Sequence, residues 1–103
     1  MQDSGSGLSH FSKEIQINII FYVYILRSEE TGKLYAGFSN DLKSRIKQHF
    51  SKDVHSTKRM GTLKLIFYEG FISEKDARRR EKYFKTTKGK RALKIMLKST
   101  LKI

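Results

Sequence analysis

The chain contains no cysteine, no proline and no tryptophan among its 103 residues. Without cysteine it cannot form a disulfide framework. No run of about 18 apolar residues is present, so the sequence predicts no membrane span. Residues 1–20 lack the basic start and apolar centre of a secretory signal peptide. These absences favour an intracellular, cytoplasmic protein that does not enter a membrane.

Acidic residues are scarce as well, since 10 of them face 22 lysines and arginines and leave a formal net charge of +12. Residues 31–103 hold 20 of the basic residues against six acidic ones. A field of this sign concentrates polyanions, and a sequence pI of about 10.1 is typical of nucleic-acid-binding domains. The alternatives are a basic surface without a partner and contact with an anionic membrane surface. We predict that the partner is nucleic acid.

The chain has the length of one domain, enough to bury roughly 60–70% of its unfolded surface without metals or disulfides as supports. Its first ten residues, MQDSGSGLSH, are small and polar. We therefore expect a flexible extension over residues 1–17 and one folded domain over residues 18–103. We expect a monomer that takes no small-molecule cofactor.

Apolar patterning predicts a hairpin followed by a helix. Residues 21–27 and the segment around Tyr35 are rich in aromatic and β-branched side chains, and they flank the polar turn Glu29–Lys33. The segment Leu42–Phe50 follows the N-cap candidate Asp41 and has apolar residues at spacings of four. We expect this apolar stripe, which ends in Phe50, to face the sheet.

The rest of the chain predicts a strand and two helices. Leu63–Phe71 is almost continuously apolar, which favours a strand covered on both faces at the centre of the sheet. Ser73 opens a capping box for a helix over Glu74–Lys85, and a last helix over Lys90–Leu101 follows a break at Thr86–Gly89. The element order is therefore β-β-α-β-α-α, that of a small α+β domain.

Two basic segments are candidates for phosphate contacts. Ser51–Thr62 has no sustained periodicity and is expected to be an exposed basic loop, a kind of segment that often binds phosphates. The last helix has a basic surface opposite its leucines. From these segments we select Lys58, Arg59, Lys88, Lys90, Arg91 and Lys94.

Two tyrosines lie on neighbouring strands of the expected hairpin. Cross-strand neighbours on one face are about 4.5–5.5 Å apart, so the hydroxyls of Tyr24 and Tyr35 can converge on one substrate atom. Gly37 removes side-chain bulk beside Tyr35 and lets another backbone or a ligand approach closely. Either tyrosine alone would be interpreted as a core residue with its hydroxyl at the rim.

A glutamate interrupts the apolar stripe of the helix after the third strand. Ala77, Glu81 and Phe84 fall at i, i+4 and i+7, the spacing of a core-facing stripe. Burying an unpaired carboxylate costs several kcal/mol, so Glu81 needs a cation. Either it pairs with one of the three arginines at 78–80, or it is a ligand of Mg²⁺, which takes one or two protein carboxylates and otherwise water and substrate phosphate.

Arg45 and His49 are four residues apart on the flank of the helix Leu42–Phe50, so both would point toward the tyrosines. Phosphodiester hydrolysis needs a water-activating base, a cation on the scissile phosphate and a donor for developing charge. The two tyrosines, the arginine, the histidine and the glutamate provide a candidate for each role.

With these residues the sequence resembles a GIY-YIG nuclease domain, of the small stand-alone type similar to the N-terminal domain of the nucleotide excision repair endonuclease subunit. The likeness covers about residues 21–97, with residues 22–24 (YVY) at the first triplet and residues 35–37 (YAG) at the second. The positions of the family's helix arginine, histidine and metal-binding glutamate are occupied by Arg45, His49 and Glu81.

The resemblance implies a three-stranded antiparallel sheet flanked by helices, and an endonuclease that hydrolyses DNA with Mg²⁺, or Mn²⁺ in its place. It also implies selection of DNA by structure, in repair or recombination. Tyr35 would help take the proton from the attacking water, Tyr24 would orient the nucleophile or phosphate, and Arg45 would stabilise the transition state. Glu81 would hold the metal, and His49 would relay the proton or orient Tyr35.

Two departures from the family bear on catalysis. No asparagine follows Glu81, where several members have one, and Phe38 stands where the repair-type enzymes have a lysine. The alternatives are a nucleic-acid-binding module with weak or lost cleavage and a subunit that acts through protein contacts. The intact set of Tyr24, Tyr35, Arg45 and Glu81 favours the nuclease.

Overall fold

The computed structural model describes residues 19–102, and the extension expected over residues 1–17 lies outside them. Three strands and three helices follow one another in the predicted order and end in a short 3-10 helix, which confirms the α+β fold. The elements are β1 (Phe21–Ser28), β2 (Leu34–Ser39), α2 (Leu42–Phe50), β3 (Leu63–Phe71), α3 (Glu74–Phe84), α4 (Thr87–Met96) and η1 (Thr100–Lys102). Each helix between residues 19 and 102 is too short or too polar to cross a membrane.

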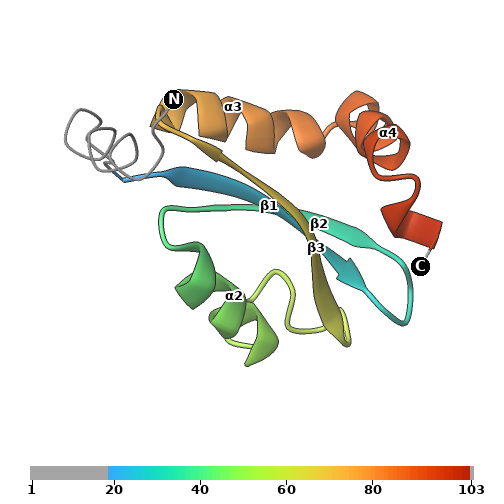
Figure 1. Cartoon of the computed structure of the whole chain (residues 1–103). Helices are drawn as coiled ribbons and strands as arrows, with labels where there is room; N and C mark the ends of the chain where they lie inside the picture. Colours follow the sequence, from blue (N-terminus) through green and yellow to red (C-terminus); the bar gives the residue numbers. More distant parts are fainter. Residues whose placement is uncertain (1–18, 103) are drawn as a thin grey trace, which may run out of the picture.

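The strands form one antiparallel sheet in the order β2-β1-β3 (Figure 1). The prediction that strand 63–71 is central is therefore wrong, because β1 is central and β3 is an edge strand. A bulge explains the apolar run of β3: Phe67 pairs with Ile25 and Leu65 with Leu26, which leaves Ile66 as an extra residue. Ile66 and Phe67 then both pack against the α3 and α4 side.

Alternation along β1 divides the interior into two layers. Val23 and Ile25 face α3 and α4, while Tyr24 and Leu26 face α2. Figure 1 shows α3 and α4 on one side of the sheet and α2 on the other. The first layer, on the α3 and α4 side, is completed by Ala36, Ala77, Phe84, Leu93 and Leu97.

The last helix begins earlier and ends earlier than predicted. Thr86 is its N-cap and its side chain accepts a hydrogen bond from the Gly89 amide at 3.0 Å, so α4 starts at Thr87 instead of Lys90. A Cβ atom at Gly89 would overlap the backbone carbonyl of Tyr83, so this glycine permits the close approach of α4 to the end of α3.

Candidate active site

Strands β1 and β2 place both tyrosines on the face that α2 covers. Tyr24 pairs with Gly37 and Leu26 with Tyr35, so the two tyrosines are diagonal neighbours across the strands. The ring of Tyr24 lies directly over Gly37, where any Cβ atom would overlap it. The close approach predicted at Gly37 is therefore made by a side chain of the neighbouring strand, and the expected backbone or ligand does not occupy this place.

His49 is fully buried between the two tyrosines. Its Nε2 atom lies 2.7 Å from the hydroxyl oxygen of Tyr24, and its Nδ1 atom lies 2.7 Å from the Oγ1 atom of Thr57. The imidazole centroid is 5.5 Å from the ring of Tyr24 and 5.4 Å from that of Tyr35, with edge-on geometry in both pairs. His49 thus contacts both tyrosines, as predicted from its position one turn after Arg45.

The buried face of α2 is rotated relative to the prediction. Phe50 is 51% exposed, although it was expected to face the sheet, and His49 takes the buried position instead of the flank. Burial of the imidazole is possible because each ring nitrogen has a hydrogen-bonding partner. This rotation brings the histidine under the tyrosines and leaves the phenylalanine ring at the surface.

Thr57 is the residue of this site that the sequence did not reveal. The segment Ser51–Thr62 was expected to be an exposed loop, and this is wrong for Val54 and Thr57, which are both buried. A turn in which the Thr57 amide donates to the Val54 carbonyl at 3.1 Å directs the threonine inward. The signal available was a valine three residues before a threonine in an otherwise polar segment.

Burial dominates the protonation of the site. It raises the pKa of Tyr24 to about 12, although a hydrogen bond and the positive charge of Arg45 oppose the shift. The hydroxyl of Tyr24 therefore keeps its proton at neutral pH. Burial, helped by the charge of Arg45, lowers the pKa of His49 to about 4, so the imidazole is neutral.

Arg45 reaches the site from the same helix as His49. Its Nη1 atom donates to the Oε1 atom of Gln48 at 2.9 Å. The guanidinium charge acts on both Tyr24 and His49, which locates it beside the two buried rings. The prediction that Arg45 and His49 point to the same side of α2 as the tyrosines is confirmed by these interactions.

Glu81 comes to the site from α3, whereas Arg45 and His49 come from α2. Its side chain is 17% exposed, and its Oε2 atom pairs with the Nζ atom of Lys85 at 3.2 Å. The same Nζ atom lies 5.6 Å from the ring centroid of Tyr35, and the charge of Glu81 acts on Tyr24. Glu81 is thereby brought together with the two tyrosines, and Lys85 joins them as a cation that no sequence pattern indicated.

The ion pair of Glu81 differs from the predicted alternative. The arginines at 78–80 pair with other carboxylates, Glu74, Asp76 and Glu69 respectively, at 3.3, 2.9 and 2.5 Å. The lysine one turn further along α3 is the partner of Glu81 instead. Because Lys85 is itself 50% exposed, this pair lies partly in water and is not a buried structural ion pair.

The carboxylate of Glu81 fits a metal site of the water-rich type. Residues 19–102 contain no group of three or more His, Cys, Asp or Glu side chains that would enclose a metal. Mg²⁺ does not require such a group, because it binds one or two carboxylates together with water and substrate phosphate. Glu81, partly exposed beside Tyr35, provides a donor of this kind.

The six predicted phosphate contacts are all exposed. They form two groups on different sides of the domain, because α4 packs on the face of the sheet opposite to α2 and the loop that follows it (Figure 1). Their contact with nucleic acid stays a prediction. The loop carries Lys58 and Arg59, and α4 carries Lys88, Lys90, Arg91 and Lys94.

The model of the GIY-YIG catalytic domain matches residues 20–94 of the chain. The chain belongs to this family. It is 33% identical over 82 residues to a UPF0213 protein of Clostridium perfringens, covering 79% of this chain and 87% of the relative. It is 37% identical over 76 residues to a UPF0213 protein of Bacillus pumilus, covering 72% of this chain and 76% of the relative. UPF0213 protein YazA of Bacillus subtilis is 36% identical with the same coverage.

The names of these GIY-YIG relatives state no activity. No solved structure matches the chain significantly. The family itself indicates a nuclease-type hydrolase with DNA as its substrate, and GIY-YIG nucleases are generally dependent on a divalent metal.

Proposed function

We propose that this protein is a metal-dependent endonuclease that hydrolyses phosphodiester bonds in DNA, with Mg²⁺ as its metal and Mn²⁺ as a substitute. The observation that supports this most is the convergence of side chains from β1, β2, α2 and α3 on one site within a GIY-YIG domain. In this proposal the protein acts as a cytoplasmic monomer in DNA repair or recombination and selects DNA by its structure. The converging residues are Tyr24, Tyr35, Arg45, His49 and Glu81.

Tyr24 orients the attacking water and is not the base. Its pKa of about 12 keeps the phenol neutral, so the hydroxyl is a hydrogen-bonding group at physiological pH. With a neutral imidazole, the phenol donates to Nε2 of His49 while Nδ1–H donates to Thr57. One lone pair of the Tyr24 oxygen accepts from Arg45, and the other accepts a proton of the water and fixes its direction.

Tyr35 takes the proton from this water. Its ring lies against His49, and the ammonium group of Lys85 lies 5.6 Å from the ring centroid. Tyr35 acts as the phenolate, after its own proton has passed to solvent, and the positive charge of Lys85 stabilises that phenolate. The phenolate becomes neutral when it accepts the proton, and the hydroxide that is left attacks the phosphorus. Arg45 binds the non-bridging phosphate oxygens, where the guanidinium stabilises the extra charge of the transition state.

Glu81 would hold the metal ion, which when bound makes water more acidic and polarises a phosphate oxygen. For this the carboxylate must turn from Lys85 toward the substrate. The pair is exposed enough to open, because half of the Lys85 side chain is already in contact with solvent. Lys85 is then available to neutralise the DNA backbone.

A cleavage screen tests the proposal. Plasmid, duplex, flap and branched DNA are incubated with the protein and either Mg²⁺, Mn²⁺ or EDTA. We expect cuts that require the metal and favour one class of DNA structure. Binding to these substrates without any metal-dependent cut would show instead that the chain is a binding module.

A further inference from the structure

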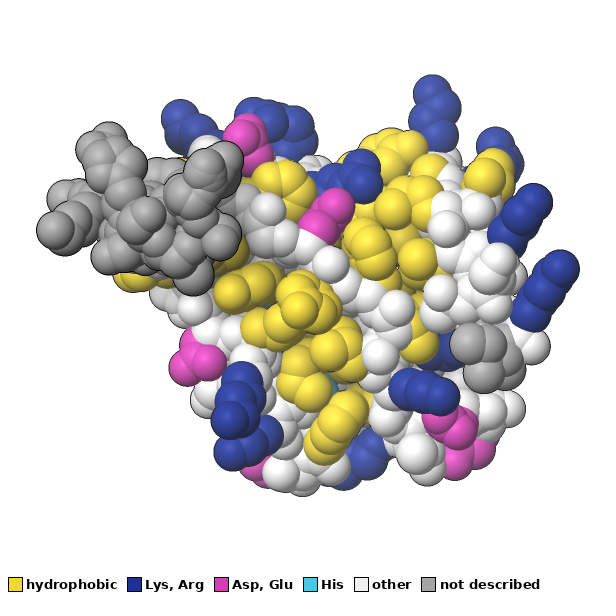
Figure 2. Space-filling view, in the orientation of Figure 1, with side chains coloured by type: hydrophobic (Ala, Val, Ile, Leu, Met, Phe, Trp, Pro, Cys, Tyr) yellow, Lys and Arg dark blue, Asp and Glu magenta, His cyan; other side chains and the backbone are white. Residues whose placement is uncertain are grey.

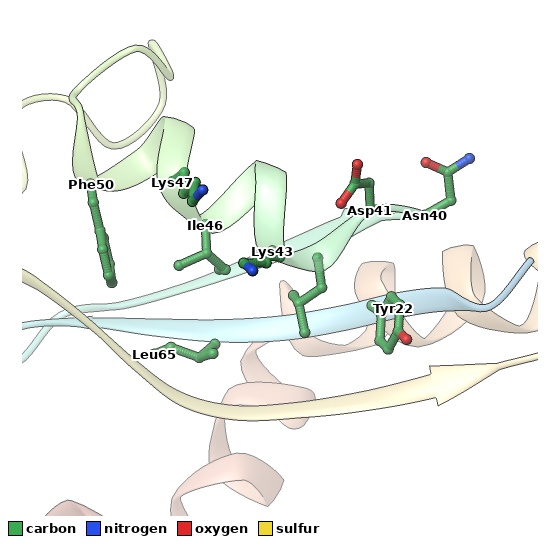
Figure 3. Close-up of a pocket in the computed structure, with 9 residues that line it drawn as sticks. Tyr22, Asn40, Asp41, Lys43, Ile46, Lys47, Phe50 and Leu65 are labelled. Carbon is green, nitrogen blue, oxygen red and sulfur yellow. The ribbon is translucent and has the colours of Figure 1, made fainter.

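A groove of about 600 Å³ lies between α2 and the strands β1 and β3, on the side of α2 that carries Ile46 and Phe50 (Figure 3). Helical periodicity separates two rows of side chains on α2: Arg45 and His49 lie along the row toward the candidate active site, and Ile46 and Phe50 lie along the other. Tyr22 of β1 and Leu65 of β3 form the floor of the groove. The remaining lining residues are Asn40, Asp41, Leu42, Lys43 and Lys47.

The groove presents aromatic rings to solvent. Phe50 is 51% exposed at one end of the groove. Tyr68 lies outside the lining and is 54% exposed beside the lining residue Tyr22, with ring centroids 6.0 Å apart in an edge-on arrangement. Figure 2 shows hydrophobic side chains gathered in a band beside α2, with Lys and Arg side chains along one border. Contiguous apolar surface of this kind on a small basic domain marks an interaction site.

The rim of the groove is positive. Lys43 and Lys47 are exposed and one helical turn apart, so both ammonium groups lie along the same border. The acidic lining residue, Asp41, is engaged by the helix, since its Oδ1 atom accepts a hydrogen bond from the Ser44 amide at 3.2 Å. The combination of aromatic floor and cationic rim suits an anion with flat apolar groups.

We propose that this groove binds unpaired bases of single-stranded nucleic acid by stacking. Proteins that bind single strands combine a cationic groove with aromatic side chains, and one stacked base changes affinity by about five- to hundredfold. Bases in a duplex are already stacked on one another and do not present their faces to Phe50. The groove therefore selects strands with unpaired bases, and the lysines hold the adjacent phosphates.

The position of the groove also indicates which DNA the proposed endonuclease would cut. This part of the inference rests on the proposed function. An α-helix is about 10 Å across its side chains. A stacked strand advances about 3.4 Å per nucleotide, so roughly three nucleotides connect the groove with a phosphate at the candidate active site. DNA that carries a single-stranded arm, as flaps and branches do, would occupy both places at once.

A single tryptophan tests the proposal directly, because the chain has none of its own. The Phe50→Trp protein is titrated with oligothymidine, with a duplex of equal length and with heparin, all in EDTA so that no cleavage occurs. We expect fluorescence quenching by the single strand and almost none by duplex or heparin. The matched control is Ile95→Trp on α4, where the native side chain is 69% exposed. Because α4 carries predicted phosphate contacts, any response of this control should be the same for the single strand and the duplex.

Affinity provides the second measurement. Phe50→Ala should weaken oligothymidine binding at least about fivefold by fluorescence anisotropy and change duplex binding less than about twofold. Ile95→Ala should change neither. Because both native side chains are exposed, melting temperatures should match the wild type.

Several results would overturn the inference. If Phe50→Ala lowered the affinity for single strand and duplex equally, or if heparin quenched the tryptophan of Phe50→Trp, the groove would be a general cationic surface. Blue-shifted tryptophan emission of Phe50→Trp without nucleic acid would mean that protein covers the groove. A shift that grows with protein concentration would identify a second copy of the chain, and a constant shift would identify the same chain. Because binding is measured without metal, failure of cleavage would refute the endonuclease and leave this result standing.

Discussion

The hydroxyl oxygen of Tyr24 and the Nε2 atom of His49 lie 2.7 Å apart, and both side chains are fully buried. Thr57 completes the arrangement by contacting the other ring nitrogen. These three side chains come from a strand, a helix and a loop, so the hydrogen-bonded chain fixes the loop after α2 to the central strand. The orientation of Tyr24 therefore depends on a threonine outside every helix and strand.

Thr57→Val should show whether that threonine positions the site. Valine keeps the shape and removes the oxygen, so Nδ1 of His49 loses its partner and the free energy of unfolding should fall by about 1–3 kcal/mol. Cleavage under saturating DNA should fall roughly tenfold, a fraction of the effect of a lost proton-transfer group, while DNA affinity stays constant. Thr57→Ser should restore the rate. A valine variant with the wild-type rate would remove Thr57 from the account.

The buried imidazole predicts a specific loss of stability in acid. The pKa of His49 is about 4 in the folded protein, below the value of about 6.5 for an unfolded histidine, so between these pH values only the unfolded chain binds the proton. The contribution of the neutral imidazole to the free energy of unfolding is intact above pH 6.5, decreases as the pH falls toward 4, and amounts to roughly 3 kcal/mol. Urea unfolding across this range measures it.

His49→Gln provides the control for that measurement. Glutamine does not titrate, so the slope of stability against pH between 4 and 6.5 should become shallower. The same slope in both proteins would assign the acid sensitivity to other groups.

Tyr35→Phe should slow cleavage by at least about a hundredfold, the usual scale for loss of a positioned proton-transfer group. Stability should hardly change, because phenylalanine keeps the ring that packs against His49. Tyr24→Phe differs in this respect, since it leaves a buried nitrogen of His49 without its partner and should also destabilise the fold. Single-turnover rates and urea unfolding separate the two effects, and full activity of Tyr35→Phe would refute its role as the base.

DNA binding should be mainly electrostatic. If the domain neutralises about five phosphates, the logarithm of affinity should fall with the logarithm of salt concentration with a slope of about −4 to −5. Replacing Lys90, Arg91 and Lys94 by glutamine should weaken binding to every sequence and leave single-turnover cleavage at saturating enzyme nearly unchanged. A response that is flat in salt would contradict the charge-based account.

The local part of the fold could be predicted from the sequence. The hairpin around Glu29–Lys33 and the helix after Asp41 depend on turn and capping residues that act on their own neighbours. The pattern around Glu81 also located a carboxylate that interrupts an apolar stripe. These features depend only on residues close together in the sequence, and they are present in the structure.

The long-range part could not be predicted in the same way. The central place of β1 depends on which strands pair, and strand pairing joins distant residues. The bulge at Ile66 gives the edge strand β3 an apolar run of the kind expected for a central strand. The burial of His49 depends on Thr57, eight residues away in a loop with no periodicity. Lys85 was overlooked because its contact with Tyr35 joins α3 to a strand from the other half of the chain.

The central claim is that Glu81 serves the metal-dependent reaction and not the stability of the fold. Glu81→Gln removes the charge and keeps the shape, and Lys85→Gln breaks the same ion pair while leaving the carboxylate in place. The lysine end of this pair is half exposed, and i,i+4 ion pairs on helices typically contribute only about 0.3–0.5 kcal/mol. Both variants should therefore melt within a few degrees of the wild type.

The most direct measurement is the single-turnover cleavage rate of these two variants in Mg²⁺, with thermal melting of the same preparations. We predict that Glu81→Gln cleaves at least about a hundredfold more slowly than the wild type, since it loses the carboxylate that holds the metal, and that Lys85→Gln retains cleavage within about tenfold. Glu81→Gln should still bind DNA in EDTA. A Glu81→Gln protein that is destabilised by about 1–3 kcal/mol but cleaves at the wild-type rate would contradict the account.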